Sequence, residues 1–289
     1  MTAERTGTGT KASRPVSGRR LDAATRMLPA LLVLLVAWQA VVSIGGVAPW
    51  ILPAPWQVLQ ALFEHRHALA GHAVVTGAEI VAGLVLGVTL GVGSAVLLCV
   101  VHGARRWALP LMVISQAVPV FALAPVLTLW LGYGPGAKVA MATLIIYFPV
   151  VAASVDGLRH TDPAMLDLAR TLGASRRAEL WHLRLPAALP SIGSGIRVAA
   201  SVAPIGAVVG EWTGSSAGLG HAMLQANARL QTDLMFAALA CLCALAIALY
   251  AAVDRCLDRA LYWQGDHLHL SSTPDPRATP ATTDELPTR

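Results

Sequence analysis

The sequence has little charge for its length. Of its 289 residues, 13% are Asp, Glu, Lys or Arg and 55% are hydrophobic, and the mean hydropathy is +0.61. Soluble domains carry about 25% charged residues. This shortage of charge excludes an ordinary soluble domain and indicates an integral membrane protein.

The net charge of +5 would suit nucleic acid binding if the basic residues formed a patch. They lie instead between apolar blocks and at the two ends of the chain. That distribution is typical of charges that orient a protein in a membrane. We therefore expect lipid, and no nucleic acid, as a partner.

Cysteine and catalytic motifs are also scarce. Three of the four cysteines lie in apolar runs, where a thiol usually packs, and Cys241 and Cys243 are too close for a C-x-x-C motif. There is no G-x-x-x-x-G-K-[ST] phosphate loop, no H-E-x-x-H motif and no pair of aspartates inside an apolar run. The sequence therefore predicts no metal site, no catalytic residue and no cofactor held by this chain.

Long apolar runs, by contrast, are abundant. A helix needs roughly 20 apolar residues to cross a bilayer. Six candidate spans cover about residues 27–47, 74–101, 108–130, 138–155, 189–210 and 234–253. The first follows Arg19 and Arg20 as in an export signal, but its length and the five later spans favour a retained helix.

The predicted fold is an all-α membrane domain over residues 27–263. Residues 1–26 and 264–289 are rich in Thr, Ser, Pro and charge, which predicts disordered tails. Lys and Arg concentrate in the N-terminal segment, after the second span, after the fourth span and after the sixth. Since cytoplasmic loops carry the excess of Lys and Arg, six spans with both termini in the cytoplasm satisfy the pattern.

A charged segment separates the fourth span from the fifth. Residues 156–184, which we name the cytoplasmic segment, contain nine charged residues in 29. Asp162-Pro163 is typical of a helix start, and Gly173 of a helix end or bend. A second helical run over 176–184 then leads to Leu185-Pro186. One apolar stripe is expected on the first helix, from Met165, Leu166, Ala169 and Leu172.

Two interpretations of this short helix follow from the residues. An apolar stripe with charged flanks suits a helix that inserts into a partner's groove. The same features suit an interfacial helix that rests on lipid headgroups. The residue pattern does not choose between them.

A resemblance to a known family favours the first interpretation, a helix that inserts into a partner's groove. The spacing of Asp167, Ala169, Gly173, Leu183 and Leu185-Pro186 resembles the EAA…G…I-LP loop of ABC-importer permeases. Asp167 stands where the family usually has Glu, Leu168 for Ala, and Leu183 for Ile, and these changes conserve charge or bulk. The resemblance covers about residues 28–263 and is strongest to the nitrate/sulfonate/taurine branch.

The resemblance implies a type I ABC-importer permease fold with a cytoplasmic coupling helix between the fourth and fifth transmembrane helices. Its partners would be a separate ATP-binding subunit, a periplasmic or lipid-anchored substrate-binding protein and a second permease copy, as a homodimer in the inner or plasma membrane. The residues expected to form the coupling loop are Asp167, Ala169, Arg170, Gly173, Leu183, Leu185 and Pro186.

The substrate expected from resemblance is a hydroxymethylpyrimidine-type precursor of thiamine. Residues 119–134, 159–175 and 203–220 look most like that subgroup, and a nitrate, sulfonate or taurine type of solute is the alternative. The absence of a strongly basic path disfavours a small anion. A secondary transporter or channel not driven by ATP would need ion-coupling residues in the spans, which hold few.

Several residues inside the spans are candidates for the translocation pathway. Ionisable groups in a membrane are costly and often functional, and prolines break helices that line pathways. The candidates are Glu79, Gln116, Pro119, Pro125, Glu211 and Trp212. The alternatives are an interfacial carboxylate in water for Glu79, ordinary helix packing for the prolines and an interfacial anchor for Trp212.

Three further features of the sequence have more than one possible role. Arg197 would snorkel to the cytoplasmic headgroups or gate the pathway. Gly83, Gly87, Gly91 and Gly93 give a small-residue face for close approach of another helix. The outer loop predicts a short helix over 219–230, whose polar side chains would contact a binding protein or form a solvated face.

Overall fold

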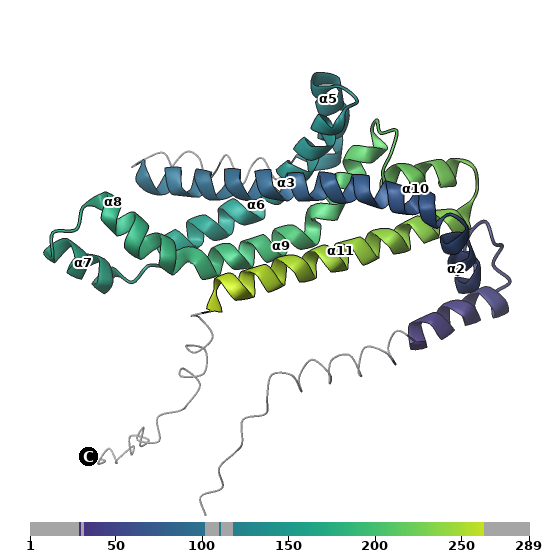
Figure 1. The fold of residues 1–289 in the computed structure, drawn as a ribbon, viewed down its shortest axis with the longest axis horizontal. Coiled ribbons are helices and arrows are strands. Elements are labelled where there is room, and N and C mark those ends of the chain that lie inside the picture. Colours follow the sequence, from purple (N-terminus) through teal and green to yellow (C-terminus); the bar gives the residue numbers. More distant parts are fainter. Residues whose placement is uncertain (1–28, 30–31, 102–109, 111–117, 263–289) are drawn as a thin grey trace, which may run out of the picture. The chain divides into compact units, whose positions relative to one another are not determined.

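The computed structural model describes residues 29, 32–101, 110 and 118–262, whose regular secondary structure is helical (Figure 1). The predicted tails lie outside these residues. In chain order the elements are α2 (Pro55–Glu64), α3 (Arg66–Val100), α5 (Val120–Leu131), α6 (Pro135–Arg159), α7 (Pro163–Thr171), α8 (Arg176–Glu179), the π-helical turn η1 (Leu180–Arg184), α9 (Leu185–Trp212), α10 (Leu219–Ala228) and α11 (Thr232–Ala260).

Four helices in the described ranges are long and apolar enough to cross a membrane. They are Arg66–Val100, Pro135–Arg159, Arg176–Trp212 and Thr232–Ala260, and they contain the predicted second, fourth, fifth and sixth spans. Shorter apolar helices, Leu32–Ile44 and Val120–Leu131, fall within the predicted first and third spans, parts of which lie outside the described residues. The protein is therefore an all-α membrane protein, and the count of six spans stays a prediction.

The chain divides into two compact units. The first comprises Met1–Leu69 and Ala222–Ala240. Within it, Trp38 and Phe236 pack with ring centroids 5.8 Å apart, and the Thr232 hydroxyl donates to the Trp50 carbonyl over 2.9 Å. These contacts hold the start of α11 against the helix Leu32–Ile44 and against the segment that follows it.

The second unit comprises Ala70–His221 and Cys241–Arg289, and small residues bring its helices close together. A Cβ added to Gly83 on α3 would lie 2.5 Å from Ala142 Cβ on α6. A Cβ added to Gly91 would lie 2.9 Å from Val150 Cγ1, also on α6. Gly87 approaches Ile146 of α6 in the same way. The predicted small-residue face is confirmed for these three glycines, whereas the added Cβ of Gly93 has no atom of the described residues within 4 Å.

Helix α9 approaches α6 in the same way. A Cβ added to Gly195 would lie 2.6 Å from Ala153 Cβ, and one added to Gly206 would lie 2.6 Å from Ala142 Cα. Ala142 therefore contacts both neighbouring helices. In this unit α6 packs between α3 and α9, and a glycine supplies one side of each of these close contacts.

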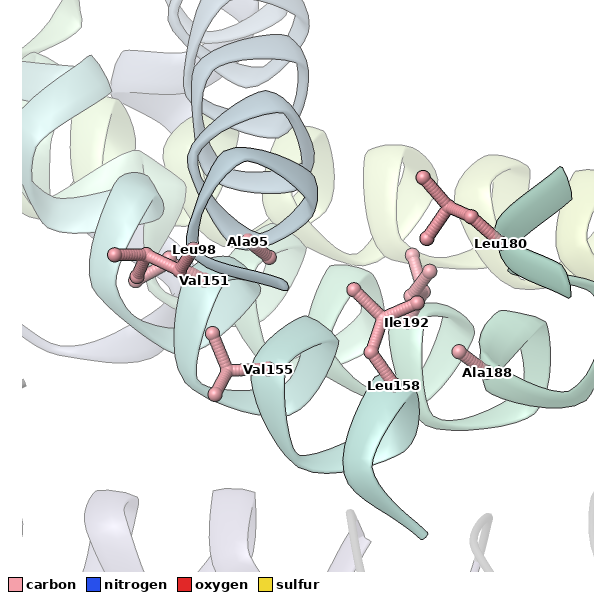
Figure 2. Close-up of a cluster of buried hydrophobic side chains, with 8 residues drawn as sticks. All are labelled: Ala95, Leu98, Val151, Val155, Leu158, Leu180, Ala188 and Ile192. Carbon is pink, nitrogen blue, oxygen red and sulfur yellow. The ribbon is translucent and has the colours of Figure 1, made fainter. Parts of the chain in front are cut away.

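A buried apolar cluster joins the ends of these helices to the cytoplasmic segment. Figure 2 shows its side chains converging from α3, α6, η1 and α9. The members are Ala95, Leu98, Val151, Val155, Leu158, Leu180, Ala188 and Ile192. Because Leu180 of η1 belongs to this core, the cytoplasmic segment is anchored to the helices that enter the membrane.

Candidate functional site

The first helix of the cytoplasmic segment begins where the sequence predicts. The Asp162 carboxylate caps α7 by accepting the Ala164 N–H over 2.9 Å, and Pro163 occupies the first helical position. An Asp cap followed by Pro satisfies the N–H groups that a helix start leaves unpaired. The short surface helix is therefore specified by its own sequence.

The outward face of α7 is apolar, but it is not the predicted stripe. Leu166 is buried at 9% exposure and Ala169 is half-buried, so these two residues face the protein. Met165, Leu168 and Leu172 are exposed at 53%, 61% and 79%. The prediction of one stripe including Leu166 and Ala169 was wrong, because α7 has apolar residues on two faces and only packing distinguishes them.

Gly173 ends α7 in the left-handed conformation, with φ of +82°. The Gly173 N–H donates to the Arg170 carbonyl over 3.0 Å, and the Ala174 N–H donates to the Ala169 carbonyl over 2.9 Å. This pair of bonds is the Schellman motif, in which a positive φ is usually supplied by glycine. The predicted bend at Gly173 is confirmed, and it sets the angle between α7 and α8.

A buried carboxylate ties the two sides of the bend together. Glu179 is 5% exposed and accepts hydrogen bonds from both Arg170 and Arg184. The Glu179 Oε2–Arg170 Nε distance is 3.2 Å, and the Glu179 Oε1–Arg184 Nη2 distance is 2.5 Å. We name these three residues the Glu179 ion-pair cluster. It links α7, α8 and η1, so the orientation of α7 depends on it.

Arg170 was among the predicted coupling-loop residues, whereas Glu179 and Arg184 were not. One signal was available, because Glu179 is the only acidic residue between Leu168 and Gly210 and basic residues surround it. A single acid among several arginines is a candidate for a shared ion pair. The partner could not be identified, since Arg170 lies nine residues away across a bend.

The remaining coupling-loop candidates lie along the same stretch of chain. Asp167 is exposed and pairs with Arg170 at 3.3 Å. Leu183 and Leu185 are half-buried, and Pro186 is at the start of α9. The structure thus brings Asp167, Arg170 and the bend together around Glu179, while the leucines continue into the transmembrane helix.

At the other end of α9, Glu211 is the centre of a buried hydrogen-bond network. Glu211 is 1% exposed. Its Oε1 accepts the Thr76 hydroxyl over 2.6 Å, and its Oε2 accepts the N–H groups of Gly220 and His221 over 2.5 and 3.2 Å. Gly218 adopts φ of +117°, and an added Cβ would overlap the Glu211 carboxylate. The carboxylate therefore fixes the turn after α9 onto α3.

Glu79 and Lys138 form a second buried polar pair. Lys138 Nζ lies 3.0 Å from Glu79 Oε1, and the two side chains are 9% and 5% exposed. The alternative of a Glu79 carboxylate in water therefore does not fit. Within the described ranges, Glu79 Oε2 has no hydrogen-bond partner. Sequence reasoning named Glu79 without Lys138, which lies 59 residues further along the chain.

The other pathway candidates lie near α5, at the end of α9 or outside the described residues. Gln116 lies outside the described residues. Pro119 precedes α5 and Pro125 lies inside it. Trp212 is half-exposed, and its indole N–H donates to the Gly220 carbonyl over 3.1 Å. Their place in the pathway stays a prediction.

Arg197 has partners that neither alternative anticipated. Its Nε lies 2.6 Å from Asp254 Oδ1 and its Nη2 lies 2.8 Å from Asp258 Oδ1. Both aspartates are on α11, so the arginine links α9 to α11. The helix predicted over 219–230 is confirmed as α10 and ends at Ala228.

Comparison with known proteins identifies relatives over most of the chain. Residues 83–261 match the family described as binding-protein-dependent transport system inner membrane component. A "Probable ABC transporter permease protein" of Haemophilus influenzae is 52% identical over 240 residues, which is 82% of this chain and 98% of that protein.

Two relatives carry more specific names. The formylaminopyrimidine transport permease protein of Halalkalibacterium halodurans is 35% identical over 234 residues, 81% of this chain and 93% of that protein. The taurine transport system permease protein of Escherichia coli is 28% identical over 257 residues, 84% of this chain and 90% of that protein.

Proposed function

The chain belongs to the family of binding-protein-dependent transport system inner membrane components, and from this membership we propose that α7 couples it to a separate ATPase. It is the transmembrane permease subunit of an ABC importer of the nitrate/sulfonate/taurine branch. Membership implies an ATP-binding subunit and a substrate-binding protein as partners. ATP would be bound by the former and not by this chain.

The observation that carries the coupling proposal is the exposed apolar face of α7. Met165, Leu168 and Leu172 follow one another at helical spacing and are more than half exposed. Such a face on a short helix inserts into a partner's groove. The Gly173 bend and the Glu179 ion-pair cluster hold this face at a set angle, which favours a docking role over a helix resting freely on lipid.

Co-purification tests this proposal. Leu168→Glu places a charge in the centre of the face, whereas Leu168→Met keeps its apolar character and serves as the matched control. We expect the ATP-binding subunit to be lost from detergent-solubilised Leu168→Glu and retained by Leu168→Met. Retention by both variants, with unchanged ATP hydrolysis, would assign α7 to the lipid surface.

We also propose six spans, both termini in the cytoplasm and a homodimer with the pathway between the two copies. The apolar segments Leu32–Ile44 and Val120–Leu131 support the two spans that the described helices cover in part. A chain with one set of spans would form half of a pathway, which a second copy completes by symmetry. Cross-linking of single-cysteine variants in native membranes would detect the pair.

The proposed substrate is a pyrimidine of the formylaminopyrimidine type. The relative transporting formylaminopyrimidine is more similar to this chain than the taurine permease, at 35% against 28% identity. The described interior also lacks an unpaired base that would attract a small anion, since Lys138 is neutralised by Glu79. Uptake of labelled formylaminopyrimidine by the reconstituted importer, with taurine as the competing solute, tests this assignment.

In that assay we expect uptake of the pyrimidine and no competition from taurine. Taurine uptake in place of the pyrimidine would place the protein with the sulfonate and taurine permeases. Uptake of either solute without ATP would instead favour the secondary-transporter alternative.

A further inference from the structure

A cavity of about 570 Å³ lies beside the cytoplasmic segment. It is bounded by the end of α3, which contributes Cys99, and by the chain from α7 to η1. A single water molecule occupies about 30 Å³ of liquid, so this space accommodates a polyatomic ligand.

The lining of the cavity is strongly basic. Four arginines contribute to it, Arg170, Arg176, Arg177 and Arg184, and Glu179 is the only acidic residue among the lining residues. Four guanidinium groups and one carboxylate give a formal charge of +3. Glu179 is shared between Arg170 and Arg184, so the described lining residues together carry more positive than negative charge. Asp167 contacts Arg170 from outside the cavity, where its side chain is 75% exposed.

We propose that this cavity binds a phosphate-bearing anion. Guanidinium groups are planar donors that bind phosphate oxygens in pairs, which makes clustered arginines suited to phosphate recognition. Arg170 and Arg184 enter the cavity from opposite sides of the Gly173 bend and are held in place by Glu179. A bound phosphate would bridge the bend to the end of α3.

Two sources supply this chemistry. The headgroup of an anionic phospholipid can enter from the inner leaflet, where basic residues near the surface attract it. A soluble phosphate or phosphate ester can enter from the cytoplasm. Neither source depends on the coupling proposal, because the cavity is formed by this chain alone.

Cys99 provides a reporter inside the cavity. Its Sγ lies 3.9 Å from Arg184 Nη1, and the thiol is free and half-buried. In the full chain, replacement of Cys241, Cys243 and Cys256 by Ala leaves Cys99 as the single reactive thiol. Its alkylation rate by a neutral maleimide then reports occupancy of the cavity.

The first arm uses phosphatidylcholine nanodiscs with inorganic phosphate against chloride at constant ionic strength. At phosphate about ten times its Kd, occupancy is expected to slow alkylation of Cys99 about tenfold. The second arm uses nanodiscs that contain phosphatidylglycerol, without added phosphate. Slow alkylation there identifies the lipid headgroup as the ligand, and slow alkylation only with phosphate identifies a soluble ligand.

Matched variants distinguish anion binding in the cavity from a general effect of positive charge on the alkylation rate. The double variant Arg176→Gln with Arg177→Gln removes two lining cations, and Arg159→Gln removes one cytoplasmic cation that does not line the cavity. We expect protection to be lost in the first and kept in the second. Equal protection in both variants, or no protection by either ligand in the parent chain, overturns the proposal.

A second measurement on the parent chain does not rely on these variants folding. Reaction of Cys99 with an anionic methanethiosulfonate reagent forms a mixed disulfide and releases methanesulfinate. Relative to the rate of each reagent with a small free thiol, it should be faster than reaction with the cationic reagent of similar size, because the cavity concentrates anions. Equal rates, or faster reaction of the cation, also overturn the proposal.

Discussion

Single residues decide how the cytoplasmic segment is shaped. The cap at Asp162 and the positive φ at Gly173 define where α7 starts and stops. Both were predicted from local sequence, because a cap and a left-handed C-terminus depend on neighbouring backbone groups alone.

Gly173 provides the sharpest test at this scale. A Cβ added there meets no atom of the described part of the chain within 4 Å, so the expected penalty comes from the backbone conformation. Gly173→Ala costs roughly 1–2 kcal/mol in this conformation, whereas Asn visits it readily. We expect Gly173→Ala to retain the ATP-binding subunit about tenfold less well than Gly173→Asn in quantitative co-purification. Equal retention would mean that the bend is not needed for docking.

Glu211 is the corresponding residue at the C-terminal end of α9. Glu211→Gln keeps the shape of the side chain but places an amide where two oxygens accept three hydrogen bonds. A buried donor left without an acceptor costs about 1–3 kcal/mol. The thermal unfolding midpoint in detergent should therefore fall. Gln225→Ala, at an exposed position on α10, is the control, and an unchanged midpoint for Glu211→Gln would contradict the network.

The ion pairs show which contacts between single residues could not be predicted from the sequence. Glu79 pairs with Lys138, Arg197 with Asp254, and Glu179 with Arg170 across a bend. Each acid or base is visible in the sequence, but its partner is set by how the helices pack. Individual charged residues were therefore predicted as candidates, but the ion pairs that they form were not predicted.

At the scale of elements, helix type and extent were predicted well and helix orientation poorly. Hydropathy located α3, α6, α9 and α11, since long apolar runs have few other structures available in a membrane. The face of α7 was assigned incorrectly because Leu166 and Leu168 are equally apolar in the sequence. Only the packing of Leu166 against the protein distinguishes them.

Close packing of α3 on α6 gives a prediction for an element. Gly87→Leu forces a side chain into Ile146, whereas a Cβ at Gly93 on the same helix meets no atom of the residues that the structure describes. Overpacking of this kind typically costs about 1–3 kcal/mol. We expect Gly87→Leu to lower the unfolding midpoint and Gly93→Leu to leave it within error. Equal effects of the two would mean that the α3–α6 contact is not close.

For the whole molecule, the six-span topology makes the orientation of two helices testable. Gln60 lies on exposed α2, which the topology places outside, and Arg177 lies on α8 inside. In a cysteine-free background, Gln60→Cys should react with a membrane-impermeant maleimide in intact cells. Arg177→Cys should react only after permeabilisation. Labelling of both in intact cells would require a different number of spans.

At this scale the sequence predicts the protein family more firmly than it predicts the substrate. The loop spacing around Gly173 and Leu185-Pro186 indicated an ABC-importer permease, and the comparisons confirm that family. Substrate choice depends on a few side chains along a pathway that two copies would share. It also depends on a binding protein encoded elsewhere, so one chain does not determine it.

The close approach of α6 to both neighbours has a mechanical consequence. Ala142 and Val150 contact glycines on α3, and Ala142 also contacts Gly206 on α9. Where a glycine lies directly against the neighbouring helix there is little room to slide, because a small displacement brings atoms of the two helices into contact. A push delivered at η1 would therefore move α3, α6 and α9 together, and bending is expected at the prolines inside these helices, Pro149 in α6 and Pro190 and Pro204 in α9.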